Sequence, residues 1–185
     1  MSSRKAVLHN PNSDQAVSHK LGTLRKIISG GQTGVDQAAL DFAIEQDIPH
    51  GGWCPKGRKS EDGPLEPKYR LIETPSVSYP LRTEWNVRDS DASVIFSIAP
   101  ILTGGSRKTV DFAIKHNKPW LHLHQGGVSP HVALVKFIRE HKVATLNVAG
   151  PRASKEPEVS GFVKTVLEAS FFLDPRRHKP ITTWQ

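Results

Sequence analysis

The sequence contains a single cysteine, Cys54, so no disulfide can form within the chain. A lone thiol is typical of proteins in a reducing compartment, and we expect a cytoplasmic protein. No apolar run approaches the roughly 20 residues that span a bilayer. The first residues also lack the apolar stretch of a secretory signal. We therefore predict no membrane partner.

Positive charge is present, but most of it lies near the two ends of the chain. The net charge is +7; residues 1–26 hold five basic and one acidic residue, and residues 173–185 hold three basic and one acidic residue. Residues 27–172 are therefore close to neutral. A nucleic-acid-binding domain would show a basic stripe or a recognition motif in its folded part. The sequence has neither, so we predict no specific nucleic-acid partner.

Strand-like and helix-like apolar patterns alternate through the chain. They predict strands at 24–29, 92–98, 120–124 and 143–148, and helices at 35–46, 79–88, 107–117, 130–141 and 157–172. This alternation favours a parallel sheet. We predict one Rossmann-like α/β domain over residues 24–172, with a mostly parallel sheet, helices on both faces and three layers. Flexible tails are expected at 1–23 and 173–185, and loop-rich residues 50–77 suggest a lid over a ligand.

Two glycine-rich turns each join a predicted strand to a predicted helix. They are SGGQTGVD at residues 29–36 and LTGGSRKT at residues 102–109. Glycine lets the backbone approach a ligand closely, and a helix N-terminus offers free N–H groups and the positive end of its dipole to an anion. Because both turns follow strands, we expect them at one edge of the sheet. Together they predict a crevice for a small phosphorylated ligand.

The side chains near these turns suit a phosphorylated ring compound. Arginine and lysine neutralise phosphate, and tryptophan offers a flat surface to a ring. Other interpretations stay open, because Thr33 and Asp36 also suit helix caps and Glu84 suits an i,i+4 ion pair with Arg88. The predicted ligand-binding residues are Gly30, Gly31, Gln32, Thr33, Gly34, Asp36, Trp53, Lys56, Arg58, Arg82, Glu84, Trp85, Asn86, Thr103, Gly104, Gly105, Ser106, Arg107 and Lys108.

No catalytic residue and no metal site are predicted. His122 and His124 alternate on a predicted strand without a third ligand at a telling distance. Cys54 has no evident partner base. The glycine spacing of the first turn is not that of a dinucleotide-binding fingerprint, and neither turn ends in the Gly-Lys-Ser/Thr of a P-loop.

Several segments resemble the putative molybdenum cofactor carrier family, a circularly permuted branch of the Rossmann-like SLOG superfamily. The resemblance is carried by residues 28–39 (ISGGQTGVDQAA), 49–63 (PHGGWCPKGRKSEDG), 73–76, 82–91 (RTEWNVRDSD), 102–106 (LTGGS) and 146–151 (LNVAGP). It implies a homo-oligomeric carrier, a dimer or tetramer, that holds the molybdenum cofactor as cargo without altering it. Trp53 or Trp85 would lie near the pyranopterin ring. A molybdoenzyme or a protein of cofactor synthesis would be the partner.

Two alternatives arise within the same superfamily. Lysine-decarboxylase-like phosphoribohydrolases use a PGGxGTxxE motif, whose acidic position aligns here with Asp111. Arg107 and Lys108 replace the Gly and Thr of that motif. The second alternative is a sensor that binds an intact nucleotide and changes its oligomeric state.

Overall fold

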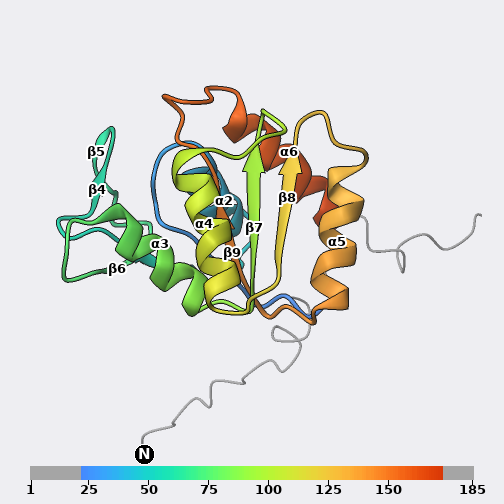
Figure 1. The fold of residues 1–185 in the computed structure, drawn as a ribbon, viewed down its shortest axis with the longest axis horizontal. Coiled ribbons are helices and arrows are strands. Elements are labelled where there is room, and N and C mark those ends of the chain that lie inside the picture. The colour runs from blue at the N-terminus through green and yellow to red at the C-terminus, as the bar shows by residue number, and fades with distance from the viewer. Residues whose placement is uncertain (1–21, 173–185) are drawn as a thin grey trace, which may run out of the picture.

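A computed structural model describes residues 22–172, and its centre is a five-stranded sheet (Figure 1). All neighbouring strands run parallel, in the order β2-β1-β9-β7-β8. The strands are β1 (Lys26–Ile28), β2 (His50–Gly51), β7 (Ala92–Ser97), β8 (Trp120–His124) and β9 (Thr145–Ala149). The first and last of these strands in the chain, β1 and β9, therefore pair in the interior of the sheet.

Helices cover both faces of this sheet. Figure 1 shows α4 in front of the sheet and α2 and α6 behind it. The helices are α2 (Val35–Glu45), α3 (Tyr79–Arg88), α4 (Gly104–Lys115), α5 (Pro130–Glu140) and α6 (Val159–Phe172). The predicted three-layer Rossmann-like fold is thus confirmed. None of the helices within residues 22–172 combines the length and apolarity that a membrane crossing requires.

The two faces of the sheet differ in polarity. On β7, Val94 and Phe96 belong to the main apolar core, which also takes in residues of α2, α5 and α6. The alternate residue Ser93 faces the other way, where its Oγ accepts a hydrogen bond of 2.9 Å from Asn147 Nδ2 on β9. Side chains alternate between faces along a strand. The sheet therefore presents buried polar groups toward the α3 and α4 side.

Residues 50–77 contain more regular structure than the sequence predicts. Besides β2, the segment includes β3 (Trp53–Cys54) paired with β6 (Ile72–Glu73), and a hairpin of β4 (Lys59–Ser60) with β5 (Gly63–Pro64). A second apolar cluster anchors the segment to α2 through residues that include Leu40, Cys54 and Leu65. Strands of two residues are too short to show an alternating pattern, which is why the sequence suggests only loops here.

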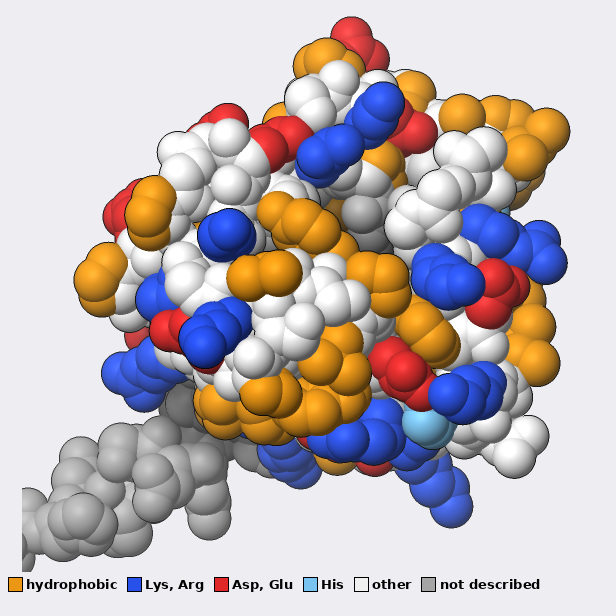
Figure 2. Space-filling model, turned by 60° about the vertical axis from the view of Figure 1, so that its left-hand side comes forward, with side chains coloured by type: hydrophobic (Ala, Val, Ile, Leu, Met, Phe, Trp, Pro, Cys, Tyr) orange, Lys and Arg blue, Asp and Glu red, His pale blue; other side chains and the backbone are white. Residues whose placement is uncertain are grey.

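The predicted tails lie almost entirely outside the described residues. Within the described part, the chain begins at a turn over residues 22–23, where Thr23 Oγ1 donates to the Val143 carbonyl at 2.8 Å. Figure 2 shows the face that carries α3 and the β4–β5 hairpin. On that face Lys and Arg side chains are scattered among acidic and apolar ones and do not form a stripe.

Candidate functional site

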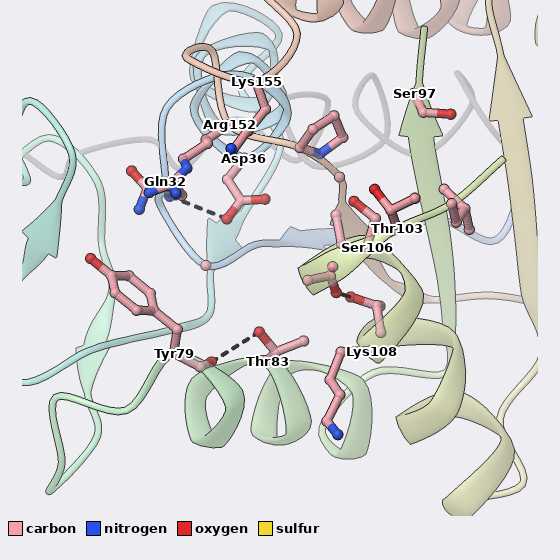
Figure 3. Close-up of a pocket in the computed structure, with 18 of the residues that line it drawn as sticks. Gln32, Asp36, Tyr79, Thr83, Ser97, Thr103, Ser106, Lys108, Arg152 and Lys155 are labelled. Carbon is pink, nitrogen blue, oxygen red and sulfur yellow. Dashed lines mark hydrogen bonds between the residues drawn. The ribbon is translucent and has the colours of Figure 1, made fainter. Parts of the chain in front are cut away.

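A pocket of about 580 Å³ lies where the two glycine turns meet at the carboxyl edge of the sheet (Figure 3). Its walls come from both turns, the start of α3 and the segment that follows β9. Ten of the predicted residues line it: Gly30, Gln32, Asp36, Arg82, Asn86, Thr103, Gly104, Gly105, Ser106 and Lys108. The volume falls within the range of roughly 300–1,000 Å³ that is usual for small-molecule sites.

Several backbone N–H groups of the first glycine turn donate hydrogen bonds within the protein. The N–H of Gln32 donates to Asp36 Oδ2 at 3.1 Å, and the N–H of Thr33 donates to Gln32 Oε1 at 3.1 Å. The N–H of Val35 donates to the Pro151 carbonyl at 3.3 Å. Gly34 has φ +80, and a Cβ there would lie 2.6 Å from the Pro151 carbonyl oxygen. This turn is therefore packed tightly between α2 and the segment after β9.

Arg82 and Asp36 form an ion pair inside the pocket. Arg82 Nη1 lies 2.7 Å from Asp36 Oδ2, and the two side chains are 13% and 3% exposed. The guanidinium packs so closely on Gly30 that a Cβ there would lie 1.2 Å from Nη1. Arg82 Nε has no hydrogen-bond partner, alone among buried side-chain nitrogens and oxygens of residues 22–172. Arg82 thus lines the pocket while keeping one buried donor, Nε, without a hydrogen-bond partner.

The second glycine turn opens α4 toward the same pocket. Its N-cap residue, Thr103, makes no side-chain cap hydrogen bond. Gly104 has φ +52, a conformation that favours glycine, and a Cβ added at Gly104 or Gly105 would meet no heavy atom within 4 Å. The first N–H groups of a helix have no partner within that helix. The start of α4 therefore presents donors and a positive dipole end to an anion.

Cations outnumber carboxylates in the pocket lining. Arg152 and Lys155, from the segment after β9, lie near Gln32 and Asp36, across the drawn site from Lys108 (Figure 3). The lining carboxylates already have partners. Asp36 pairs with Arg82, and Glu156 Oε2 accepts the Ile98 N–H at 2.5 Å. The pocket therefore favours a negatively charged ligand.

Neutral polar groups and apolar side chains complete the pocket. Asn147 and Ser97 come from the sheet and are each 2% exposed. Tyr79 and Ile101, which are 42% and 75% exposed, contribute apolar surface from α3 and from the loop before α4. Hydrogen-bonding groups together with apolar surface suit a ligand with a heterocyclic ring.

Both predicted tryptophans pack outside the pocket lining. Trp53 and Trp85 contact each other edge to face, with ring centroids 4.7 Å apart. Trp53 Nε1 donates to Asp89 Oδ2 at 2.7 Å. Asn86, although it lines the pocket, accepts the Trp53 N–H at 2.8 Å and donates to the Trp53 carbonyl at 2.9 Å. These residues join α3 to β3, and the aromatic ring in the pocket lining belongs to Tyr79.

Other predicted residues also lie outside the pocket lining: Gly31, Thr33, Gly34, Lys56, Arg58, Glu84 and Arg107. Glu84 Oε1 on α3 contacts two groups of the α4 end, Lys115 Nζ at 2.6 Å and His116 Nε2 at 3.0 Å. These hydrogen bonds lower the pKa of Glu84. Arg107 Nε lies 3.3 Å from Asp111 Oδ1 in an exposed i,i+4 pair.

Arg58 holds the loop over residues 58–71 together. Its guanidinium donates to four backbone carbonyls at 2.9–3.3 Å: those of Leu65, Glu66, Tyr69 and Leu71. This use of the side chain differs from the predicted contact with a ligand phosphate. The position itself has φ +50. Arg58 thus acts as an internal brace of the loop that the sequence suggests as a lid.

We expect Arg58→Lys to loosen this loop without changing the pocket. A lysine ammonium cannot satisfy four carbonyls in the fixed planar geometry that a guanidinium provides. Amide hydrogen exchange across residues 65–71 should accelerate by roughly tenfold. Exchange at the start of α4 should match wild type, and acceleration there would contradict this assignment.

His122 on β8 hydrogen-bonds to the pocket residue Ser97. The Ser97 hydroxyl donates to the Ala99 carbonyl at 2.6 Å, and its oxygen lies 2.6 Å from His122 Nε2. Burial, together with the nearby His124, lowers the pKa of His122 below its usual 6.5, although Glu156 opposes the shift. Neutral His122 thus fixes Ser97 at the end of β7. No group of three or more His, Cys, Asp or Glu side chains within residues 22–172 is placed to hold a metal ion.

We expect this histidine to make stability depend on pH. Because its pKa is lower in the folded state, the unfolded chain binds the proton first as the pH falls below about 6.5. The free energy of unfolding should therefore decrease below that pH and level off beneath the folded pKa. Urea denaturation of wild type and His122→Gln between pH 8 and pH 4.5 measures the difference. Parallel curves for the two proteins would contradict the prediction.

The contribution of the segment after β9 is not among the predicted site residues. Arg152 and Lys155 line the pocket together with Gly150 and Pro151. A signal was available, because the predicted strand ends just before Gly150-Pro151 and its carboxyl end must lie at the same edge as the two turns. Tyr79, Pro80 and Thr83 on α3 were missed as well. Their place depends on how α3 packs against α4, which no local pattern reveals.

Fold and site together define a Rossmann-like domain with a cationic pocket at the carboxyl edge of a parallel sheet. The chain belongs to the circularly permutated YpsA SLOG family, whose model matches residues 27–171. It is similar to a solved "putative molybdenum carrier protein" from Syntrophus aciditrophicus SB, at 46% sequence identity and a TM-score of 0.78. That match covers 80% of this chain and 95% of the other. No curated protein matches the chain.

Proposed function

We propose that this protein binds the molybdenum cofactor, a phosphorylated pyranopterin, in the pocket between the two glycine turns and carries it unchanged. The observation that carries the proposal is the uncapped start of α4, which faces a pocket whose lining holds Arg82, Lys108, Arg152 and Lys155. The name of the similar solved protein supports the same cargo.

Each part of this ligand has a suitable counterpart among the lining residues. The N–H groups at Gly104, Gly105 and Ser106 suit the phosphate. Tyr79 and Ile101 suit the ring faces, and Asn147 offers hydrogen bonds to a heterocycle edge. A carrier of this kind would also need a recipient, for which a molybdoenzyme or a cofactor-synthesis protein is our proposal, and we propose that it works as a homo-oligomer in the cytoplasm.

The phosphoribohydrolase alternative gains no support from the geometry. Asp111, which aligns with the acidic position of that motif, is exposed on α4, pairs with Arg107 and is not among the pocket-lining residues. The nucleotide-sensor alternative uses the same pocket and differs from the proposed carrier function in the ligand that is bound. Identifying the small molecule that the protein retains therefore distinguishes the two.

The test is to incubate the protein with molybdenum cofactor released from a molybdoenzyme and to measure its retention and its lifetime. The proposal predicts retention of intact cofactor, a longer lifetime than in free solution and no product. Mass spectrometry of small molecules released on gentle denaturation of the purified protein gives an independent identification. Retention of a nucleoside phosphate instead of the cofactor, or release of a free base, would overturn the proposal.

A further inference from the structure

Glu61 joins three segments of the chain that lie far apart in sequence. It lies between β4 and β5, and its side chain is 16% exposed. Its Oε1 accepts hydrogen bonds from the Thr33 hydroxyl of the first glycine turn and, at 3.1 Å, from the Ser154 N–H. Its Oε2 accepts the Ser154 hydroxyl at 2.6 Å and lies 3.5 Å from Arg152 Nε. One carboxylate thus contacts both the first turn and the segment after β9.

Backbone groups reinforce the same junction. The Glu61 N–H donates to Gln32 Oε1 at 2.8 Å. The Thr33 hydroxyl oxygen accepts the Ala153 N–H at 3.2 Å, so the turn and the segment after β9 are also bonded to each other. Of the residues joined in this way, Gln32 and Arg152 line the pocket, whereas Glu61 does not. Glu61 therefore reaches the pocket only through other side chains.

Arg152, the ion-pair partner of Glu61, connects this junction to ligand binding. The Arg152 side chain is 45% exposed, and it would lose rotamer freedom on binding a ligand if it were otherwise unrestrained. Glu61 lies beside its Nε, which leaves the terminal nitrogens for another acceptor. A guanidinium already restrained by a carboxylate binds an anion at a lower entropic cost.

We propose that Glu61 is a positioning residue of the pocket, whose carboxylate orients Arg152 for an anionic ligand. This inference rests on the proposed function for the identity of the ligand, but not for its charge. The electrostatics agree: burial raises the pKa of Glu61, but hydrogen bonds from Ser154 and Thr33 and the Arg152 charge outweigh burial and lower it. Glu61 is thus held as the carboxylate that this role requires.

The experiment compares Glu61→Gln with Asp62→Asn, which removes the same charge from the neighbouring residue. Hydrogen exchange of the ligand-free proteins reports on the junction directly. We expect the Ala153 and Ser154 amides to exchange at least about tenfold faster in Glu61→Gln and at the wild-type rate in Asp62→Asn. Unchanged exchange in Glu61→Gln would overturn the proposal.

Binding of inorganic phosphate, followed by ³¹P NMR, tests whether the junction acts through Arg152. We expect Glu61→Gln to weaken phosphate binding by about tenfold and Asp62→Asn to leave it unchanged. In an Arg152→Ala background, Glu61→Gln should cause no further loss, since its target is already removed. The proposal would be overturned if Glu61→Gln weakened phosphate binding as much in the Arg152→Ala background as in the wild type. It would also be overturned if Glu61→Gln and Asp62→Asn weakened phosphate binding equally. If only the cofactor-retention test failed, the molybdenum cofactor would be ruled out as cargo, but the role of Glu61 in binding an anion would still be supported.

Discussion

Gly105→Val is expected to abolish ligand binding and leave the fold intact. A Cβ at Gly105 meets no heavy atom within 4 Å, so the new side chain fits without displacing protein atoms. It would instead occupy the space in front of the first N–H groups of α4, where we place the phosphate. We expect affinity for the molybdenum cofactor to fall by at least about 100-fold, because the anion loses its closest donors. Cofactor retention and thermal unfolding measure the two parts of this result.

Gly161→Val provides a matched control for that substitution. Gly161 lies in the first turn of α6, and a Cβ there also meets no heavy atom within 4 Å. It lines a different hollow, between α2 and α6, and not the pocket described above. Its affinity should equal that of wild type. If Gly105→Val and Gly161→Val bound the cofactor with the same affinity, the start of α4 would not be part of the binding site.

The second large effect is expected for Arg82→Met. This change leaves the Asp36 carboxylate, only 3% exposed, without its cationic partner. Removing one member of a buried ion pair typically costs about 3–5 kcal/mol. We expect a loss of that order in the free energy of unfolding, measured by urea denaturation at pH 7. Cofactor retention should also be lost, because Arg82 contributes a positive charge to the pocket lining.

The double variant Asp36→Asn/Arg82→Met separates the ion pair from general packing. With both charges removed, no buried carboxylate is left unpaired, so the double variant should unfold at a higher urea concentration than Arg82→Met alone. Binding should stay lost in both proteins. Additive destabilisation from the two single substitutions would show that the pair contributes nothing beyond its separate members.

The layered fold follows from patterns that the sequence carries locally. The six residues of β7 are all buried and four of them are apolar, and α4 repeats apolar residues at helical spacing with Val110 and Ala113 buried. Such patterns reflect burial of a strand or a helix face, which each segment displays by itself. The sequence could not predict β2, because two residues joined to the sheet only by backbone pairing with β1 leave no side-chain signature.

The site was predictable where backbone conformation limits the residue type. Gly104 needs its positive φ, and Gly30 needs room for Arg82, so glycine itself marked the turns. Cationic side chains gave no such indication. Arg58 and Arg82 are both arginines beside polar segments, yet one braces loop carbonyls and the other lines the pocket. Only the long-range packing of α3 and of the loop distinguishes the two roles.

The order of strands in the sheet also bears on how the protein is made. β9 pairs with both β1 and β7, so it separates an early strand from those that follow. During synthesis, β1 cannot be joined by strand pairing to the β7–β8 half until residues 145–149 have left the ribosome. Contacts between strands that are far apart in sequence form slowly. Until then the β1 and β7 edges that pair with β9 stay unpaired, and we expect yields of native protein to depend on chaperone supply during expression.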